Sequence, residues 1–161
     1  MLAGAGALTL PLAFSESFAT TQQVLGASLN SKINHSVCRW CYESIPFETF
    51  IIETKKLGIK SIELVGEQEW PLLKKHGMTC ALPWGEGMTR SIDRGFNDPA
   101  NHEELIKGFT DIIPKVRAAG YDKIICFSGN RRGISEIDGM INCAIGIKKL
   151  IPIAEKYNIT L

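Results

Sequence analysis

Gly58-Ile59-Lys60-Ser61-Ile62-Glu63-Leu64-Val65 is the stretch that decides the fold of this chain. Its glycine is typical of the residue at which a helix ends, and the apolar, β-branched run that follows is typical of a buried strand. A polar, glycine-containing loop then leads into the next helical segment. This order of helix, glycine, strand and loop indicates a parallel sheet wrapped by helices.

The same order occurs four times along the chain. The predicted strands are Ile33–Trp40, Lys60–Val65, Met78–Trp84 and Lys123–Ser128. The predicted helices are Pro46–Leu57, Glu69–Lys75, His102–Ala119 and Ser135–Tyr157, and the residues at which they end are Gly58, Gly77, Gly120 and Asn158. The last residues, Ile159-Thr160-Leu161, read as the opening of a fifth strand.

A (β/α)8 barrel typically has about 250 residues, whereas this chain has 161. We therefore expect an α/β fold in the form of a (β/α)8 TIM barrel that is truncated after about four β/α units. Without the remaining strands such a chain leaves the edges of its parallel sheet unpaired. The fragment is accordingly expected to be inactive.

The composition is that of a folded domain, with 45% hydrophobic and 22% charged residues. A net charge of +1 gives no general attraction for nucleic acid or for an anionic membrane. The sequence therefore predicts a small polar substrate, with no nucleic-acid and no membrane partner. It is compatible with an oligomer.

Residues 1–30 differ in composition from residues 31–161, which we take as the folded domain. Leu2 to Phe14 is apolar and rich in alanine and glycine, and Ser17-Phe18-Ala19 fits the small-x-small pattern of a signal cleavage site. The apolar run is too short to span a membrane. It resembles a twin-arginine export signal without its basic n-region, which predicts a periplasmic protein; the alternative is a cytoplasmic protein with a buried N-terminal helix.

Cys38-Arg39-Trp40-Cys41 is a C-x-x-C pair at the carboxyl end of the first predicted strand. Such a pair serves as a thiol-disulfide redox site or as half of a zinc site. No second cysteine or histidine pair follows at zinc-site spacing, so the sequence predicts no metal site in this chain. Structural or pocket-lining thiols are the other interpretation.

Several side chains are predicted at the carboxyl ends of the strands, where parallel barrels bind their substrates. Glu63 is a carboxylate inside an apolar strand, and its alternative role is an ion pair at the rim of the barrel. Trp40, Tyr42 and Trp84 follow the first and third strands. Aromatic walls with a polar edge suit a carbohydrate or a hydroxy acid, although core packing also explains one or two of them.

Two loops complete this predicted mouth. Ser128-Gly129-Asn130-Arg131-Arg132-Gly133 follows the fourth strand, and its backbone amides and arginine fork suit oxyanions or sugar hydroxyls. Asn130 and Arg131 are therefore candidate substrate contacts. The alternative is a solvated turn in which an arginine pairs with Glu136 or Asp138, with Ser135 as the helix N-cap. The long polar segment 86–99 reads as a loop that shapes or covers the site.

These segments together resemble a known family. Ser-Val-Cys-Arg-Trp-Cys-Tyr at 36–42, the strand segment 58–65, Gly-Phe-Asn-Asp-Pro at 95–99 and Ile-Ile-Cys-Phe-Ser-Gly-Asn-Arg at 124–131 carry the likeness. The run from Ile33 to Leu161 resembles the N-terminal half of the hydroxypyruvate isomerase-like branch of the xylose isomerase-like barrels, the sugar phosphate isomerase/epimerase superfamily.

The resemblance implies a metal-assisted isomerisation or epimerisation of a small hydroxy-carbonyl or sugar substrate through an enediolate. It also implies a divalent cation, Mg²⁺ or Mn²⁺, whose ligands in that family come from the fifth strand onward, so that no metal ligand carries over to this chain. The positions that carry over are substrate-binding ones: Trp40, Tyr42, Glu63, Trp84, Asn130 and Arg131. The alternatives are a degenerate, non-catalytic or sugar-binding relative and a thiol oxidoreductase that uses Cys38 and Cys41.

Overall fold

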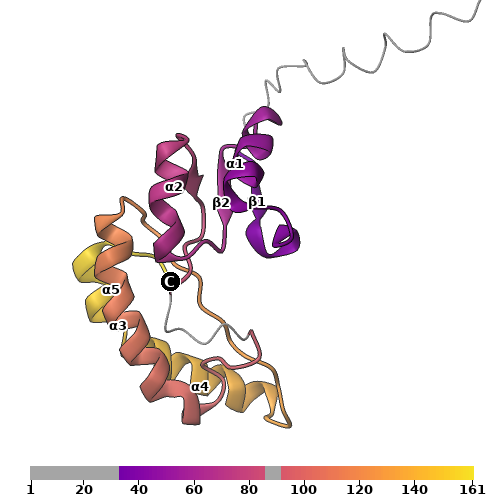
Figure 1. The fold of residues 1–161 in the computed structure, drawn as a ribbon. Helices are drawn as coiled ribbons and strands as arrows, with labels where there is room; N and C mark the ends of the chain where they lie inside the picture. Colours follow the sequence, from indigo (N-terminus) through magenta and orange to yellow (C-terminus); the bar gives the residue numbers. More distant parts are fainter. Residues whose placement is uncertain (1–32, 86–91) are drawn as a thin grey trace, which may run out of the picture. The chain divides into compact units, whose positions relative to one another are not determined.

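The computed structural model describes residues 33–85 and 92–161, and the export-like leader predicted at 1–30 lies outside them (Figure 1). The described residues form an α/β fold with a three-stranded parallel sheet and five α-helices. The strands are β1 (Ser36–Cys38), β2 (Ser61–Glu63) and β3 (Thr79–Cys80), and they are adjacent in the order β1-β2-β3. In the register Ile62 pairs with Val37 on one side and with Cys80 on the other.

Backbone hydrogen bonds continue this order beyond β3. The amide of Ile125 donates to Pro83 O at 3.3 Å, so the fourth predicted strand lies beside the end of β3. Lys123 forms a parallel bridge with Thr160, whose amide donates to Asp122 O at 2.8 Å. The extended segments therefore follow one another in chain order, whereas a doubly wound sheet would reverse about its first strand. The described residues do not show a closed barrel.

The fourth predicted strand, Lys123–Ser128, is a strand only at that single bridge. Its carboxyl half is paired with a loop in place of a neighbouring strand. The amides of Phe96 and Asn97 donate to Phe127 O at 3.2 Å and to Ser128 O at 2.8 Å. The carbonyls that would bond to a neighbouring strand in a regular β-sheet thus accept hydrogen bonds from the loop that precedes helix α3 (His102–Ala118).

The helices begin and end close to the predicted residues. They are α1 (Phe47–Lys56), α2 (Trp70–Lys75), α3 (His102–Ala118), α4 (Glu136–Lys148) and α5 (Ile151–Tyr157). The residues predicted to end them all have the left-handed backbone conformation: φ is +79° at Gly58, +66° at Gly77, +87° at Gly120 and +50° at Asn158. Glycine and asparagine adopt this conformation at the least steric cost, so these four predictions are confirmed.

The single helix predicted over Ser135–Tyr157 is wrong, because the structure has two helices there. Pro152 is in the first turn of α5 and has no amide hydrogen, so it cannot donate to the carbonyl of Lys148. The amides of Lys149 and Leu150 instead donate to the carbonyls three residues earlier, Lys149 N to Gly146 O at 3.2 Å and Leu150 N to Ile147 O at 2.8 Å. The proline therefore ends α4 and begins α5.

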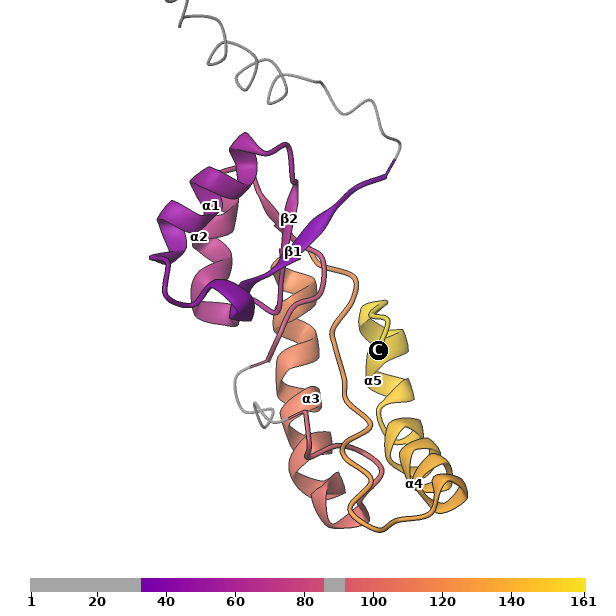
Figure 2. The same ribbon diagram turned by 90° about the vertical axis from the view of Figure 1, so that its right-hand side faces the viewer.

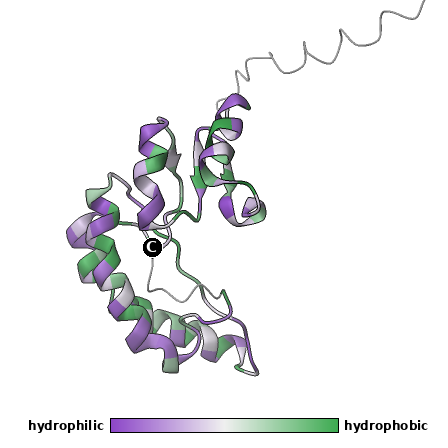
Figure 3. Cartoon of the chain, in the orientation of Figure 1, coloured by the Kyte–Doolittle hydropathy of each residue, from purple (hydrophilic) through white to green (hydrophobic). Residues whose placement is uncertain are grey.

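One apolar core joins the sheet and the helices. Apolar residues of α3 recur at helical spacing and are buried. Figure 3 shows hydrophobic and hydrophilic residues interspersed along the helices. Helix α3 packs beside α5, which Figure 2 shows from the side. Large buried side chains from α1, β2, α3 and the link between α4 and α5 are Ile51, Ile62, Phe109, Ile113 and Leu150. Within residues 33–85 and 92–161, no helix is both long enough and apolar enough to cross a membrane.

Candidate functional site

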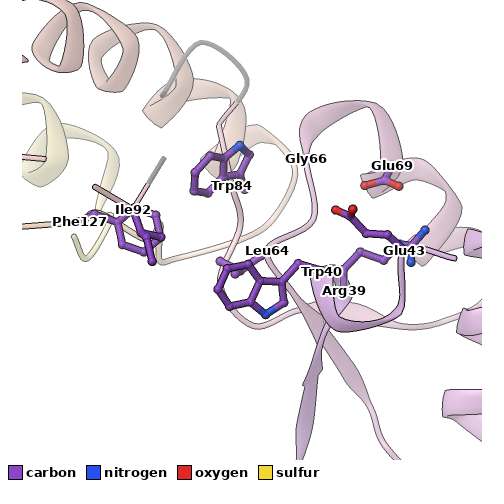
Figure 4. A pocket seen from close by; sticks show the side chains of 9 residues that line it. All are labelled: Arg39, Trp40, Glu43, Leu64, Gly66, Glu69, Trp84, Ile92 and Phe127. Atoms are coloured by element: carbon purple, nitrogen blue, oxygen red, sulfur yellow. The ribbon is translucent and has the colours of Figure 1, made fainter. Parts of the chain in front are cut away.

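A cavity of about 420 Å³ opens at the carboxyl ends of the parallel segments (Figure 4). Two 3-10 turns that follow β1 and β2 supply part of its wall: η2 (Arg39–Tyr42) and η3 (Glu67–Glu69). The described side chains and backbone that line it are Arg39, Trp40, Glu43, Leu64, Gly66, Glu69, Trp84, Ile92 and Phe127. Its volume falls within the range of about 300–1,000 Å³ that small-molecule sites occupy.

Three aromatic side chains form the apolar wall. The side chain of Trp84 is buried, and its ring centroid lies 5.6 Å from that of Phe127. Its backbone is held by a hydrogen bond from Trp84 N to Val65 O at 3.1 Å, so β2 and β3 together fix the position of the indole. Trp40 is 55% exposed at the mouth. The sequence predicted both tryptophans at this site; Phe127 was not among the predicted residues.

The guanidinium of Arg39 is engaged by groups of its own neighbourhood. It donates to Tyr42 O at 2.5 Å and to Ile45 O at 3.2 Å. It also lies over the rings of Phe47 and Phe50, at 5.1 Å and 5.6 Å from their centroids. Arg39 therefore stabilises the turn between β1 and α1, and its donors are directed at backbone carbonyls.

Two carboxylates, Glu43 and Glu69, complete the cavity. They come from the loops after β1 and β2, and Figure 4 shows both side chains on the same side of the cavity. Within the described part of the chain, neither forms a hydrogen bond or an ion pair. Sequence reasoning missed both residues. The sequence feature that could have indicated them is their position in strand-to-helix loops, because these loops lie together at one edge of a parallel sheet.

Leu64 brings strained backbone to the floor of this cavity. Its φ of +57° lies in the left-handed region, which bulky residues rarely adopt. Its amide donates to Leu82 O at 2.9 Å, so pairing with the end of β3 holds it there. Such strain persists only where neighbouring structure fixes the residue, and it is concentrated at functional sites.

Glu63 and Tyr42, both predicted as substrate contacts, do not line the cavity. The carboxylate of Glu63 accepts a short hydrogen bond from Ser36 Oγ across the β1–β2 pair. The ring of Tyr42 stacks on Phe50, with centroids 5.0 Å apart and an interplanar angle of 25°. Glu63 is therefore engaged by a neighbouring strand, and Tyr42 by helix α1.

Asn130 and Arg131 also lie outside the cavity lining. Arg131 Nε donates to Ile134 O at 3.0 Å, and its guanidinium pairs with Glu136 at 3.4 Å. This is the arginine pairing of the solvated-turn alternative. Asn130 is held through its backbone, because its carbonyl accepts from Asn97 Nδ2 at 2.8 Å and its amide donates to Asp93 O at 3.2 Å.

The glycine-rich loop after the fourth segment is shaped by close packing. Gly95 and Gly129 lie against each other: a Cβ on Gly95 would be 2.3 Å from Gly129 N, and one on Gly129 would be 2.7 Å from Gly95 N. Of the loop predicted over 86–99, residues 86–91 lie outside the described residues, Ile92 lines the cavity, and Gly95 to Asn97 are buried. This last part therefore anchors the loop after the fourth segment.

The C-x-x-C pair lies at the start of η2. Burial raises the pKa of the Cys38 thiol, and the charge of Glu63 and the neighbouring Cys41 add to this effect. A redox-active cysteine needs the opposite shift, because the thiolate is the nucleophile. In the two ranges that the structure describes, no three His, Cys, Asp or Glu side chains are grouped so that they could hold a metal ion.

A scan of the chain against protein-family models and a search of curated proteins both give no match.

Proposed function

We propose that this chain is part of a (β/α)8 barrel of the xylose isomerase-like type, and that its cavity binds the small carbohydrate or hydroxy-acid substrate of an isomerase or epimerase. One observation carries the proposal: the cavity lies at the carboxyl ends of parallel segments that follow one another in chain order. In parallel barrels this is the face on which substrates bind.

The lining supports a polyhydroxy ligand. Trp40 and Trp84 offer flat apolar faces to the C–H surface of a sugar ring. The carboxylates of Glu43 and Glu69 accept hydrogen bonds from hydroxyl groups, and bonds to charged acceptors are the stronger ones. In the isomerisation a proton moves between adjacent carbons of a hydroxy-carbonyl compound. Glu43 and Glu69 are the carboxylates of the described lining from which such a base would come.

The divalent metal implied by the resemblance does not fit the described residues. Glu43 and Glu69 are only two carboxylate side chains, and the described part of the chain has no group of three candidate ligands. Mg²⁺ and Mn²⁺ sites are octahedral and need further protein or substrate oxygens. The remaining ligands of such a metal would come from residues outside this chain, as the resemblance implies.

Tryptophan fluorescence tests the binding, because two of the three tryptophans of the chain line the cavity. Titration with D-xylose and D-fructose is expected to change the emission in a saturable way. Trp40→Ala should weaken the binding about tenfold, the equivalent of about 1.4 kcal/mol. Tyr42→Ala is the matched control, since that ring stacks on Phe50 outside the lining and its loss should leave the affinity within about twofold.

Turnover is tested on the same ligands by NMR in D₂O with added Mg²⁺ or Mn²⁺. Deuterium entering the carbon next to the carbonyl, with interconversion of aldose and ketose, supports the isomerase. Saturable binding without exchange agrees with a substrate site whose catalytic residues and metal ligands lie outside this chain, as the resemblance implies; exchange that is the same without the protein counts against an isomerase active in this chain by itself. The absence of any saturable change overturns the binding site itself.

A further inference from the structure

The described lining of the cavity carries more negative than positive charge. Its ionisable side chains are Glu43, Glu69 and Arg39. The guanidinium of Arg39 donates to two backbone carbonyls and faces two aromatic rings of α1. The two carboxylates have no such partners among the described residues. A ligand in the cavity therefore meets two unpaired anions and an arginine whose donors are turned elsewhere.

A third carboxylate, that of Glu63, adds to the negative electrostatic potential of the cavity, although it does not line the cavity. Glu63 precedes Leu64, which lines the cavity, and its partner is the neutral hydroxyl of Ser36. The charge of Glu63 contributes to the raised pKa of the Cys38 and Cys80 thiols, and that of Glu69 contributes at Cys80. The negative field thus reaches both β1 and β3. Low-dielectric walls focus such a field into the cavity.

The aromatic wall of the cavity also favours a positively charged ligand. The faces of tryptophan and phenylalanine rings carry negative partial charge and attract a cation within about 6 Å of the ring centroid. Trp40, Trp84 and Phe127 all line the cavity with the two carboxylates. Aromatic faces together with carboxylates form the arrangement that recognises ammonium groups, and both components disfavour a phosphate or a carboxylate.

Building on the function proposed above, we propose that the substrate of this cavity is an amino sugar, a polyhydroxy compound with a protonated amine, and that anionic sugars are excluded. The ammonium group lies between Glu43 and Glu69, and the C–H face of the sugar lies on the tryptophans. A cavity of about 420 Å³ accommodates a single hexose-sized ring.

The test compares four ligands of one ring type at pH 6, where a primary amine is protonated. They are D-glucosamine, N-acetyl-D-glucosamine, D-glucose and D-glucose 6-phosphate, titrated into the full chain and followed by tryptophan fluorescence and calorimetry. D-Glucosamine is expected to bind at least about tenfold more tightly than D-glucose, and the phosphate more weakly than either. N-Acetyl-D-glucosamine has a larger group at the same carbon without the charge, so it separates charge from size.

Glu43→Gln and Glu69→Gln should each lower the glucosamine-to-glucose affinity ratio at least about threefold, because each removes one charge from the lining. Glu53→Gln on α1 is the matched control: Glu53 is an exposed carboxylate paired with Lys56, and its loss should leave the ratio unchanged. Added salt should reduce the ratio in the parent chain.

The outcomes separate this inference from the function on which it rests. Equal affinity for D-glucosamine and D-glucose, tighter binding of the phosphate, or a ratio that is insensitive to both glutamine variants overturns the amino-sugar proposal and leaves a sugar site. Failure of all four ligands to bind overturns the amino-sugar proposal together with the carbohydrate site.

Discussion

Gly95 is the residue at which two loops of the described structure approach most closely. A Cβ at this position would lie 2.2 Å from the carbonyl carbon of Ser128 and 2.4 Å from Phe127 O. Both are backbone atoms, so they cannot move aside as a side chain would. Gly95→Ala should therefore destabilise the domain by about 3 kcal/mol, measured as the free energy of unfolding in urea.

Gly133→Ala provides the control for this prediction. Gly133 has φ of +84° and open space around the position of a Cβ, so alanine there meets only the left-handed backbone penalty of about 1 kcal/mol. The two substitutions add the same methyl group to neighbouring loops. Equal losses of stability would show that the contact between Gly95 and the loop at 127–129 does not limit the fold.

Cys80 is expected to be the least reactive of the cysteine thiols that the structure describes. Burial raises the pKa of Cys80 to about 12, whereas Cys41 is exposed. Because the thiolate reacts, Ellman's reagent at pH 8 should label Cys41 within minutes and Cys80 only as the chain unfolds. Mass spectrometry of the labelled peptides identifies each site. Labelling of Cys80 in the native chain at the rate of Cys41 would contradict this burial.

The raised pKa of Cys80 also predicts how the stability of the domain changes with pH. The pKa of Cys80 in the folded chain lies above the value of 9.0 for a thiol in water. Its neutral form is therefore favoured by folding, and this contribution is complete below pH 9 and is lost as the pH rises towards about 12. The urea midpoint should fall over this alkaline range, and it should fall less in a Cys80→Ala variant.

Among the elements, α4 begins at a cap that the sequence predicted. The Oγ of Ser135 accepts a hydrogen bond from Asp138 N at 3.1 Å and donates to the carboxylate of Asp138 at 2.6 Å. Ser135→Ala should cost about 1 kcal/mol of unfolding free energy, because it leaves an amide of the first turn without its acceptor. Ser135→Asn keeps an acceptor at this position and should lose less than half as much.

Helix α4 differs from the other long helix in being apolar on two faces. One face packs at Gly146, near the end of the helix, on Phe96 and His102, whose ring atoms lie 2.6 Å and 2.9 Å from the position of a Cβ on that glycine. The opposite face carries large apolar side chains in solvent, with Ile137 and Met140 each 66% exposed. Ile141 and Ile145 continue it at helical spacing.

At the scale of the whole domain, this exposed face is expected to limit solubility. Ile137→Lys combined with Ile141→Lys should reduce the binding of the dye ANS and raise the concentration at which the chain precipitates. The unfolding free energy should stay within about 0.5 kcal/mol, because neither side chain belongs to the buried core. Ile113→Lys on the buried face of α3 is the contrasting variant and should prevent folding. A large loss of stability in the Ile137/Ile141 variant would mean that the face is packed in solution.

Part of the candidate site could be predicted because it depends on chain order alone. Trp40 and Trp84 follow strands, and the carboxyl ends of parallel strands meet at one edge whatever the details of packing. The same rule predicted Glu63, which does not line the cavity. Its side chain accepts a hydrogen bond from Ser36 on the neighbouring strand. Position along a strand is a local property, whereas the partner of a side chain depends on the register with another strand.

The sequence by itself determined where the helices end. Gly58, Gly77, Gly120 and Asn158 end helices because only residues that tolerate a left-handed backbone allow the chain to turn there, and this is a property of single residues. The apolar runs between them determined that parallel segments would form. Their sequential order follows from short connections that cross over with one hand.

Only the tertiary structure decided which groups face the cavity and in what state. Glu43 and Glu69 are 26 residues apart in the sequence and line the same cavity because β1 and β2 pair in register. Arg39 is turned towards the rings of α1, and Gly95 and Gly129 are glycines because two backbones touch. These arrangements depend on contacts between distant residues and on the direction of each side chain. No window of sequence contains both partners of such a contact, so local pattern could not determine them.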